Sequence, residues 1–315
     1  MKSLLETISV RVAKSAIASM IVERIASVGA VFEDDDYAEW TKKVRFAESL
    51  WRKYFASAVD RDGSVKDGIV KKSFSFDASE IDCEEGKKVN VEAAIVELRN
   101  EDDDWNNKVK SQYYKWMEKN YASGQGDSQY ESGTNTIRIA IYGGNLENDA
   151  QIDYDVIMDT FVHEMIHGFD QVEERFPDND DYGRKYDDVP EEENNGVPYP
   201  GMPGKWGALE VTDPHYGQYY SCRAERREYA YSLMTFILRY AKNHNQSIDR
   251  VCDMLIAMIG NQGKFDKWLE NANFAIDCPL VLYHLAFSDT GNGDADDARK
   301  LVELARRYLS EKKPE

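Results

Sequence analysis

The chain has few cysteines, and no two of them stand close together. Four occur in 315 residues, namely Cys83, Cys222, Cys252 and Cys278. A zinc knuckle or a dithiol redox motif needs a CxxC pair, so this spacing excludes both. Two disulfides would require an oxidising compartment. We expect free, mostly buried thiols, because no secretion signal is evident.

Long apolar runs are also missing. A membrane span needs roughly 18 to 20 apolar residues in succession, and the chain has none. The first 30 residues are partly apolar, but charges such as Glu6 and Arg11 interrupt them, unlike the core of a signal peptide. Their apolar positions form one helical stripe, which predicts an amphipathic helix that stays on the mature protein. We therefore expect a cytoplasmic protein without a membrane partner.

Basic residues are scarce relative to acidic ones. The 39 Lys and Arg residues face 58 Asp and Glu residues, which gives a formal net charge of −19. Binding to duplex nucleic acid needs clustered basic side chains that release counterions, so nucleic acid is not the expected partner. We interpret the acidic surface as an aid to solubility rather than a device that attracts cationic substrates.

The length suits one catalytic domain with a helical annex. We assign residues 1–60 to the N-terminal helical region and residues 61–315 to the catalytic domain. Asp60 to Gly68 interrupts the helical pattern and reads as a turn rather than a calcium loop, because its glycine comes too early. The predicted elements up to residue 122 are a helix over Tyr37–Ala58, a strand over Ile69–Phe76, a strand or helix over Val89–Leu98, and a helix over Trp105–Ala122.

The clearest strand spans Thr136 to Tyr142, where isoleucine alternates with other residues. This pattern predicts a half-buried strand at a sheet edge. A helix is expected from Asp153 to Gln171, with Asp153 and Asp155 at its N-terminus. An acidic loop rich in Pro and Gly follows over residues 173–207, and the chain from Cys222 onward reads as helical. Pro177 to Gly183 resembles a calcium loop, but Tyr182 stands where an oxygen ligand is needed, so we favour a solvated loop over a Ca²⁺ site.

The one strong chemical motif lies in the predicted helix. His163 and His167 are four residues apart, so both imidazoles project from one helix face and can share a tetrahedral ion. Glu164 stands beside them, where it can act as general base on a water bound to the metal. The helix is otherwise largely apolar, and a buried His pair without a metal would be costly. The motif predicts one zinc ion per chain.

This HExxH motif resembles that of the zincin metallopeptidases, and the resemblance extends over about Thr136 to Ser232. It implies an α+β fold: a small mixed sheet with a backing helix and the HExxH helix, followed by a helical C-terminal subdomain. It also implies hydrolysis of a peptide or protein substrate by a zinc-activated water, with Glu164 as general base. In that family an edge strand before the HExxH helix pairs with the substrate, and Thr136–Tyr142 is similar to that strand.

A catalytic zinc takes three protein ligands, so one more is expected downstream. Our first choice is Glu225, near the start of a predicted helix, because a glutamate on a second helix is what the gluzincin branch uses. Three alternatives stay open: Asp213 in TDPHYG, which resembles part of the aspzincin motif, His215, which would match SprT-type proteins, and Glu228. The metzincin extension is absent, because Gly168 follows the motif at once and Asp170 replaces the later glycine.

Two further points stay open at the level of sequence. The oxyanion needs a donor beyond the metal, and the candidates are Tyr216, Tyr219, Tyr220 and an unligated His215. The rival to an enzyme is a binding or structural protein that keeps the zincin scaffold within a larger assembly. The intact HExxH favours the enzyme, since a scaffold has no use for Glu164.

Overall fold

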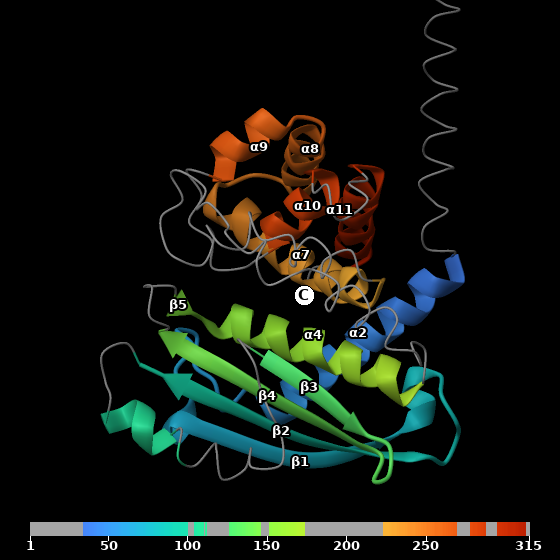
Figure 1. Ribbon diagram of the computed structural model, residues 1–315, viewed down its shortest axis with the longest axis vertical. Coiled ribbons are helices and arrows are strands. Elements are labelled where there is room, and N and C mark those ends of the chain that lie inside the picture. The colour runs from blue at the N-terminus through green and yellow to red at the C-terminus, as the bar shows by residue number, and fades with distance from the viewer. Residues whose placement is uncertain are drawn as a thin grey trace, which may run out of the picture. The chain divides into compact units, whose positions relative to one another are not determined.

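Figure 1 presents a computed structural model of the chain. The structure describes residues 34–99, 104–109, 111, 126–145, 151–173, 223–269, 278–287 and 295–312. The chain divides into two compact units, Met1–Trp40 and Thr41–Glu315. The sequence predicts a domain boundary at residue 60. Residues 1–33 of the predicted N-terminal region lie outside the described part, so this boundary stays a prediction. Everything below concerns the larger unit.

A small mixed sheet forms the base of this unit (Figure 1). Its strands run in the order β1-β2-β4-β3, and the short β5 pairs with the end of β4. The pairs β1–β2 and β3–β4 are antiparallel, whereas β2 and β4 are parallel. The strands are β1 (Ile69–Asp77), β2 (Lys88–Leu98), β3 (Gly126–Glu131), β4 (Thr136–Asn145) and β5 (Gln151–Ile152), and short 3-10 helices at Lys66–Gly68 and Ala78–Ile81 flank β1. The predicted strand Ile69–Phe76 is confirmed, and Val89–Leu98 is a strand.

The expectation that Thr136–Tyr142 forms a sheet edge is wrong. This segment is β4, and it lies between β2 and β3. Its isoleucines are fully buried on one face, while Ala140 is buried on the other against Ala94, Val96 and Val109. The strand is therefore covered on both faces, because residues 104–109 form a helix over the second one. The edge next to β4 is β3, whose polar sequence GDSQYE carries no alternation that would predict a strand.

Two helices pack on the isoleucine face of the sheet (Figure 1). They are the part of α2 (Asp34–Tyr54) that begins at Thr41, and α4 (Tyr154–Val172). Both helices agree with the predicted ones. Aromatic rings join them: Trp51 lies 5.5 Å from Phe161, and Phe46 lies 5.8 Å from Phe169, between ring centroids. Such pairs bury large apolar areas and fix the two helices relative to each other.

The C-terminal part is helical, as predicted. It comprises α7 (Arg223–Asn243), α8 (Ile248–Ile259), α9 (Gln262–Leu269), α10 (Cys278–Phe287) and α11 (Ala295–Glu311). Helix α7 packs against α4 on one side and against α8, α10 and α11 on the other. It thus joins the sheet and its helices to the C-terminal helices. No helix within the described ranges has the length and apolar character needed to cross a membrane.

The segment Asp60 to Gly68 forms a turn, as expected. Val59 and Val65 form a bridge, and Asp62 accepts a hydrogen bond from the Ser64 amide at 3.0 Å. Gly63 has a positive φ of 87°, and a Cβ there would overlap the carbonyl oxygen of Ile152. A glycine is therefore needed for this turn to pack against the start of α4. Two of the four cysteines, Cys83 and Cys252, have described side chains, and both are free thiols.

Candidate metal centre

The HExxH segment lies in the middle of α4, whose N-terminus is firmly held. Asp153 is its N-cap and accepts hydrogen bonds from the amides of Asp155 and Val156 at 3.1 and 3.2 Å. Arg239 of α7 donates two hydrogen bonds to the same carboxylate, at 3.0 and 2.7 Å. A capping carboxylate with a bidentate arginine ties the start of α4 to α7.

The two histidines converge on one point. Their Nε2 atoms lie 3.1 Å apart, with the ring centroids at 4.8 Å and the planes at 69°. Two nitrogens bound to one tetrahedral zinc at about 2.0–2.1 Å would be about 3.3 Å apart. The pair therefore fits a shared zinc ion. The same distance also allows a hydrogen bond from one imidazole to the other, which would satisfy the pair without a metal.

Burial keeps His163 in the form that binds metals. His163 is 8% exposed and His167 7% exposed. Burial, together with the charge that His167 would carry, lowers the pKa of His163 well below its usual value of 6.5. A neutral imidazole is the species that offers a nitrogen lone pair to a metal. The electrostatic environment thus suits a ligand rather than a cationic side chain.

Glu164 is buried as well, at 8% exposure. It follows His163 directly, so it lies about 100° around the helix from it. This position turns the Glu164 side chain away from the line that joins the two histidines. Such a placement is that of a base next to a metal site and not of a third ligand on the same helix.

Helix α7 crosses the site in antiparallel register with α4. Arg239 contacts Asp153, Thr235 donates to Asp159 at 3.1 Å, and the Tyr229 ring lies 4.9 Å from that of His163 at 73°. Successive contacts toward the C-terminus of α4 therefore involve residues that lie closer to the N-terminus of α7. Continued by one turn on each helix, this register leads from His163 to His167 and from Tyr229 to residue 225.

The position of residue 225 bears on the third ligand. Glu225 lies about 40° around the helix from Tyr229, and Glu228 lies about 100° from it in the same direction. Thr235 and Arg239, which contact α4, lie on that side as well, so both glutamate positions fall on the face of α7 toward α4. Both belong to α7, but the structure describes only their backbone. Asp213, His215 and the candidate donors Tyr216, Tyr219 and Tyr220 lie outside the described residues, as does the loop over residues 174–207. Within the described part, no group of three metal-binding side chains is found.

A buried ion-pair cluster follows the motif, and the sequence did not single it out. Lys43 of α2 contacts Asp170 at 2.8 Å and Glu173 at 2.6 Å, and its side chain is 1% exposed. Burial alone would lower the pKa of Lys43, but the two carboxylates outweigh it and raise the pKa. A signal was present: Lys43 stands among Trp40, Val44 and Ala47, on the apolar stripe that faces the core.

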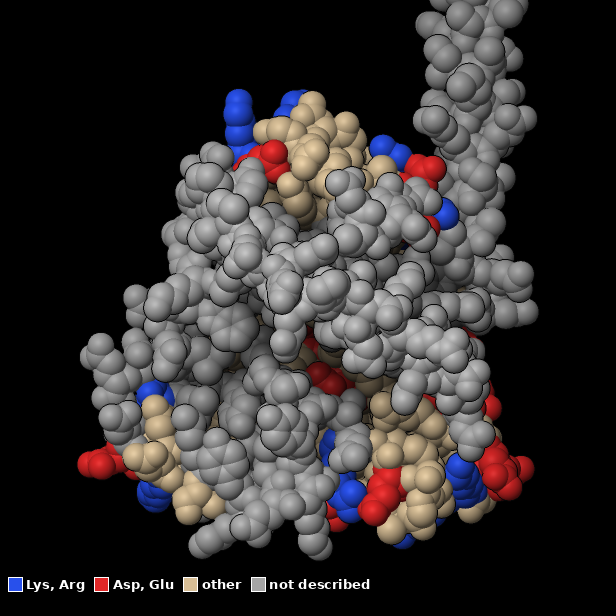
Figure 2. All heavy atoms as spheres, viewed as in Figure 1, with Lys and Arg blue, Asp and Glu red and all other residues tan. Residues whose placement is uncertain are grey.

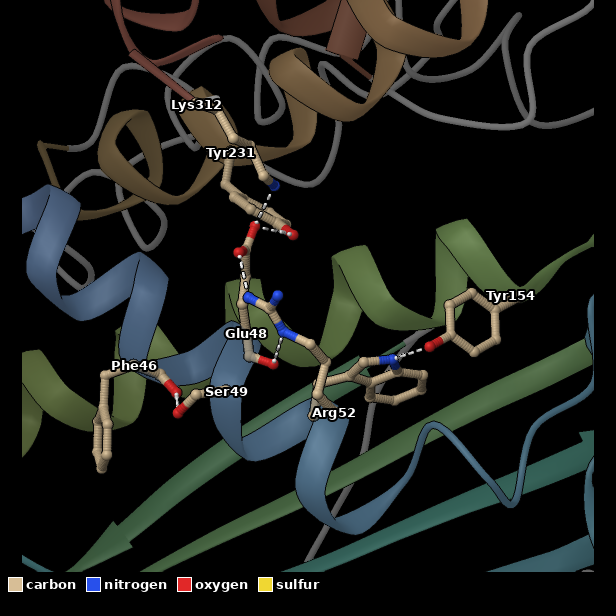
Figure 3. Close-up of polar contacts among 8 residues, drawn as sticks. Phe46, Glu48, Ser49, Arg52, Tyr154, Tyr231 and Lys312 are labelled. Atoms are coloured by element: carbon tan, nitrogen blue, oxygen red, sulfur yellow. Dashed lines mark hydrogen bonds and ion pairs between the residues drawn. The ribbon is translucent and has the colours of Figure 1, made fainter. Parts of the chain in front are cut away.

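A second buried carboxylate joins three helices near α4. Figure 3 shows Glu48 of α2 directed toward Tyr231 of α7 and toward Lys312, which follows α11. The oxygen–oxygen distance to Tyr231 is 3.3 Å, that to the Lys312 nitrogen is 3.0 Å, and Arg52 approaches at 3.0 Å. Burial and the nearby Glu48 carboxylate raise the pKa of Tyr231 well above its usual value. These contacts hold α7 over α2 and α4.

Charged side chains of both signs lie on the described surface (Figure 2). On the face in Figure 2, the described acidic and basic side chains are interspersed over the sheet and the C-terminal helices. Mixed charges of this kind are typical of a solvated surface.

No protein-family model, curated protein or solved structure matches the chain.

Proposed function

We propose that this chain is a zinc-dependent metallopeptidase with a zincin-like fold. The observation that carries the proposal is the buried pair His163 and His167, whose Nε2 atoms stand 3.1 Å apart. In this reading the two histidines and Glu225 hold one zinc ion. Glu225 is the proposed third ligand because its position falls on the face of α7 toward α4, and Glu228, Asp213 and His215 remain the competing ligands.

The chemistry divides between the metal and the protein. Zinc, when bound, would act as a Lewis acid on the scissile carbonyl and make a water molecule more acidic. Glu164 would take a proton from the attacking water as general base and would pass it to the leaving amine as general acid. The burial of Glu164 would limit competition from solvent and strengthen this interaction.

The strand order of the sheet changes the prediction of which strand a substrate would pair with. Since β4 is internal, the edge of the sheet near the site, among the described strands, is β3, Gly126–Glu131. Helix α4 packs on β3 and β4, so this edge borders the HExxH helix. A peptide in extended conformation can add to such an edge through backbone hydrogen bonds. We therefore assign the substrate-binding role to β3.

A second reading is a non-catalytic scaffold that serves as a structural component of an assembly. One observation favours it: the 3.1 Å contact between the two Nε2 atoms also fits a hydrogen bond between the imidazoles. In that case the pair would need no metal, and Glu164 would have no catalytic role. The two readings make opposite predictions about zinc and about Glu164.

The test is Glu164→Gln, which keeps the size of the side chain and both imidazoles but removes the base. The variant should fold and retain about one equivalent of zinc, while peptide hydrolysis falls by roughly 10²- to 10⁴-fold. Glu303→Gln on α11, which removes a carboxylate paired with Arg306, is the matched control and should behave like the parent. Equal hydrolysis by parent and Glu164→Gln would reject Glu164 as base, and a parent without zinc or peptidase activity would favour the scaffold.

A further inference from the structure

The His163 ring is held between two neighbouring rings. His167 meets it at a centroid distance of 4.8 Å and Tyr229 at 4.9 Å, both in edge-to-face arrangement. The first contact comes from the same helix, whereas the second comes from α7. The orientation of His163 is therefore set in part by a residue 66 positions away in the sequence.

Tyr229 is itself fixed before any ligand binds. Arg239 and Thr235, on the same helix, are bonded to Asp153 and Asp159 of α4. Two residues beyond Tyr229, Tyr231 is bonded to Glu48 of α2. These three polar contacts fix the position of α7 relative to α4 and α2. The Tyr229 ring therefore lies against His163 without any rearrangement of the helix.

An imidazole can turn about two side-chain bonds, and only some of the resulting orientations bring its Nε2 toward that of His167. An edge-to-face ring contact stabilises one of these orientations beyond the area it buries. The contact described is between the two rings, so phenylalanine can make it as well.

We infer that Tyr229 is a positioning residue, whose ring holds His163 in the orientation that binds the metal. This inference rests on the proposed function, since it assumes a metal shared by His163 and His167. It goes further by assigning a role to a residue of α7 that is not a ligand. Groups that orient metal ligands typically change metal affinity by about 10- to 100-fold when they are removed.

The test compares the zinc affinity of the parent, Tyr229→Phe, Tyr229→Leu and Tyr229→Met by competition with a chelator. The phenylalanine variant should match the parent, whereas the two aliphatic variants should bind zinc about 10- to 100-fold more weakly. Thermal unfolding of the metal-free proteins shows which variants are folded. Two aliphatic replacements of different shape are compared, so that the test still stands if one of them does not fold.

The chain supplies a matched control. Tyr240, also on α7, stacks on His244 at 3.9 Å between ring centroids, at the opposite end of the helix from Tyr229. Tyr240→Leu removes a Tyr–His contact, here a stacked one remote from His163, and should leave zinc affinity unchanged. Aliphatic Tyr229 variants that bind zinc as tightly as the parent would overturn the inference while leaving the proposed metal site intact. A phenylalanine variant as weak as the leucine variant would overturn it too, because the hydroxyl would then be the active group. A parent that binds no zinc would refute the metal site itself.

Discussion

Gly168 of α4 lies directly against Ile137 of β4: a Cβ at position 168 would come within 2.6 Å of the isoleucine Cγ2 atom. The glycine follows His167, so it allows the turn of the helix that carries His167 to approach the sheet closely. Larger side chains cannot fit here unless the helix or the strand shifts.

Gly168→Ala should therefore destabilise the protein by about 1–3 kcal/mol, the usual cost of overpacking a core. Gly263→Ala in α9 is the control, because the nearest atom to its added methyl group would be 3.8 Å away. It should be neutral or stabilising, since alanine is favoured over glycine in helices by up to about 1 kcal/mol. Urea unfolding of both variants measures the difference, and equal stability of the two would contradict the close packing.

Lys43 provides a second prediction. Its buried ammonium pairs with Asp170 and Glu173, so Lys43→Met leaves two carboxylates without their cation. Removal of one partner of a buried pair typically costs about 3–5 kcal/mol. The neighbouring Lys42 pairs with Asp82 at the surface, where both side chains are about half exposed, and Lys42→Met should cost at most about 1 kcal/mol. Similar losses in the two variants would contradict the assigned burial.

The pair also predicts a pH dependence. Because the folded-state pKa of Lys43 is raised above its usual value of 10.5, its contribution to stability is fully present below that pH. It is lost as the pH rises through the folded-state pKa. The difference in unfolding free energy between the parent and Lys43→Met should thus stay constant from neutral pH to about pH 10 and shrink above it. A difference that grew with rising alkalinity would have the wrong sign.

The sequence predicted α2, α4, β1 and β4 well, because each has a clear apolar period or a cap such as Asp153. It missed β3, whose polar residues are ordered by pairing with β4 rather than by their own pattern. It also placed β4 at an edge, because isoleucine alternation suggests one buried face, and nothing local shows that a helix at residues 104–109 covers Ala140.

The candidate site also has a part that the sequence predicts and a part that it does not. The sequence predicts His163, Glu164 and His167, because they lie about one helical turn apart and form a recognisable motif. Tyr229, Lys43 and Glu48 depend on contacts across 66, 127 and 183 positions. Such contacts arise from the packing of α2, α4 and α7, for which the sequence offers no local signal beyond the unusual position of Lys43 on an apolar stripe.

The third metal ligand can be tested directly. If Glu225 is the third ligand, Glu225→Ala should release zinc, whereas Glu228→Ala, on the same face of α7, should retain it. Asp213→Ala and His215→Ala complete the series. The zinc content of purified variants, measured by elemental analysis, decides among them. Zinc loss in Asp213→Ala alone would favour the aspzincin-like arrangement, and loss in His215→Ala alone the three-histidine one.

The last prediction concerns the substrate strand. In an antiparallel pair, alternate residues direct their backbone amides toward the partner strand and away from it. Ser128 and Gln129 are neighbours in β3, paired with Ile139 and Arg138 of β4, so one of their amides points to the free edge. A proline at that position removes no hydrogen bond of the sheet, whereas a proline at its neighbour does.

Of Ser128→Pro and Gln129→Pro, one should therefore fold nearly as well as the parent yet hydrolyse peptides poorly, because its amide can no longer pair with the substrate. Ala140→Pro in the internal strand β4 should lose folding and activity together, since it breaks pairing on a strand with a partner on each side. Thermal unfolding and hydrolysis rates of the three variants are compared under the same conditions. If the better-folded β3 variant cleaves peptides as fast as the parent, β3 does not bind the substrate backbone.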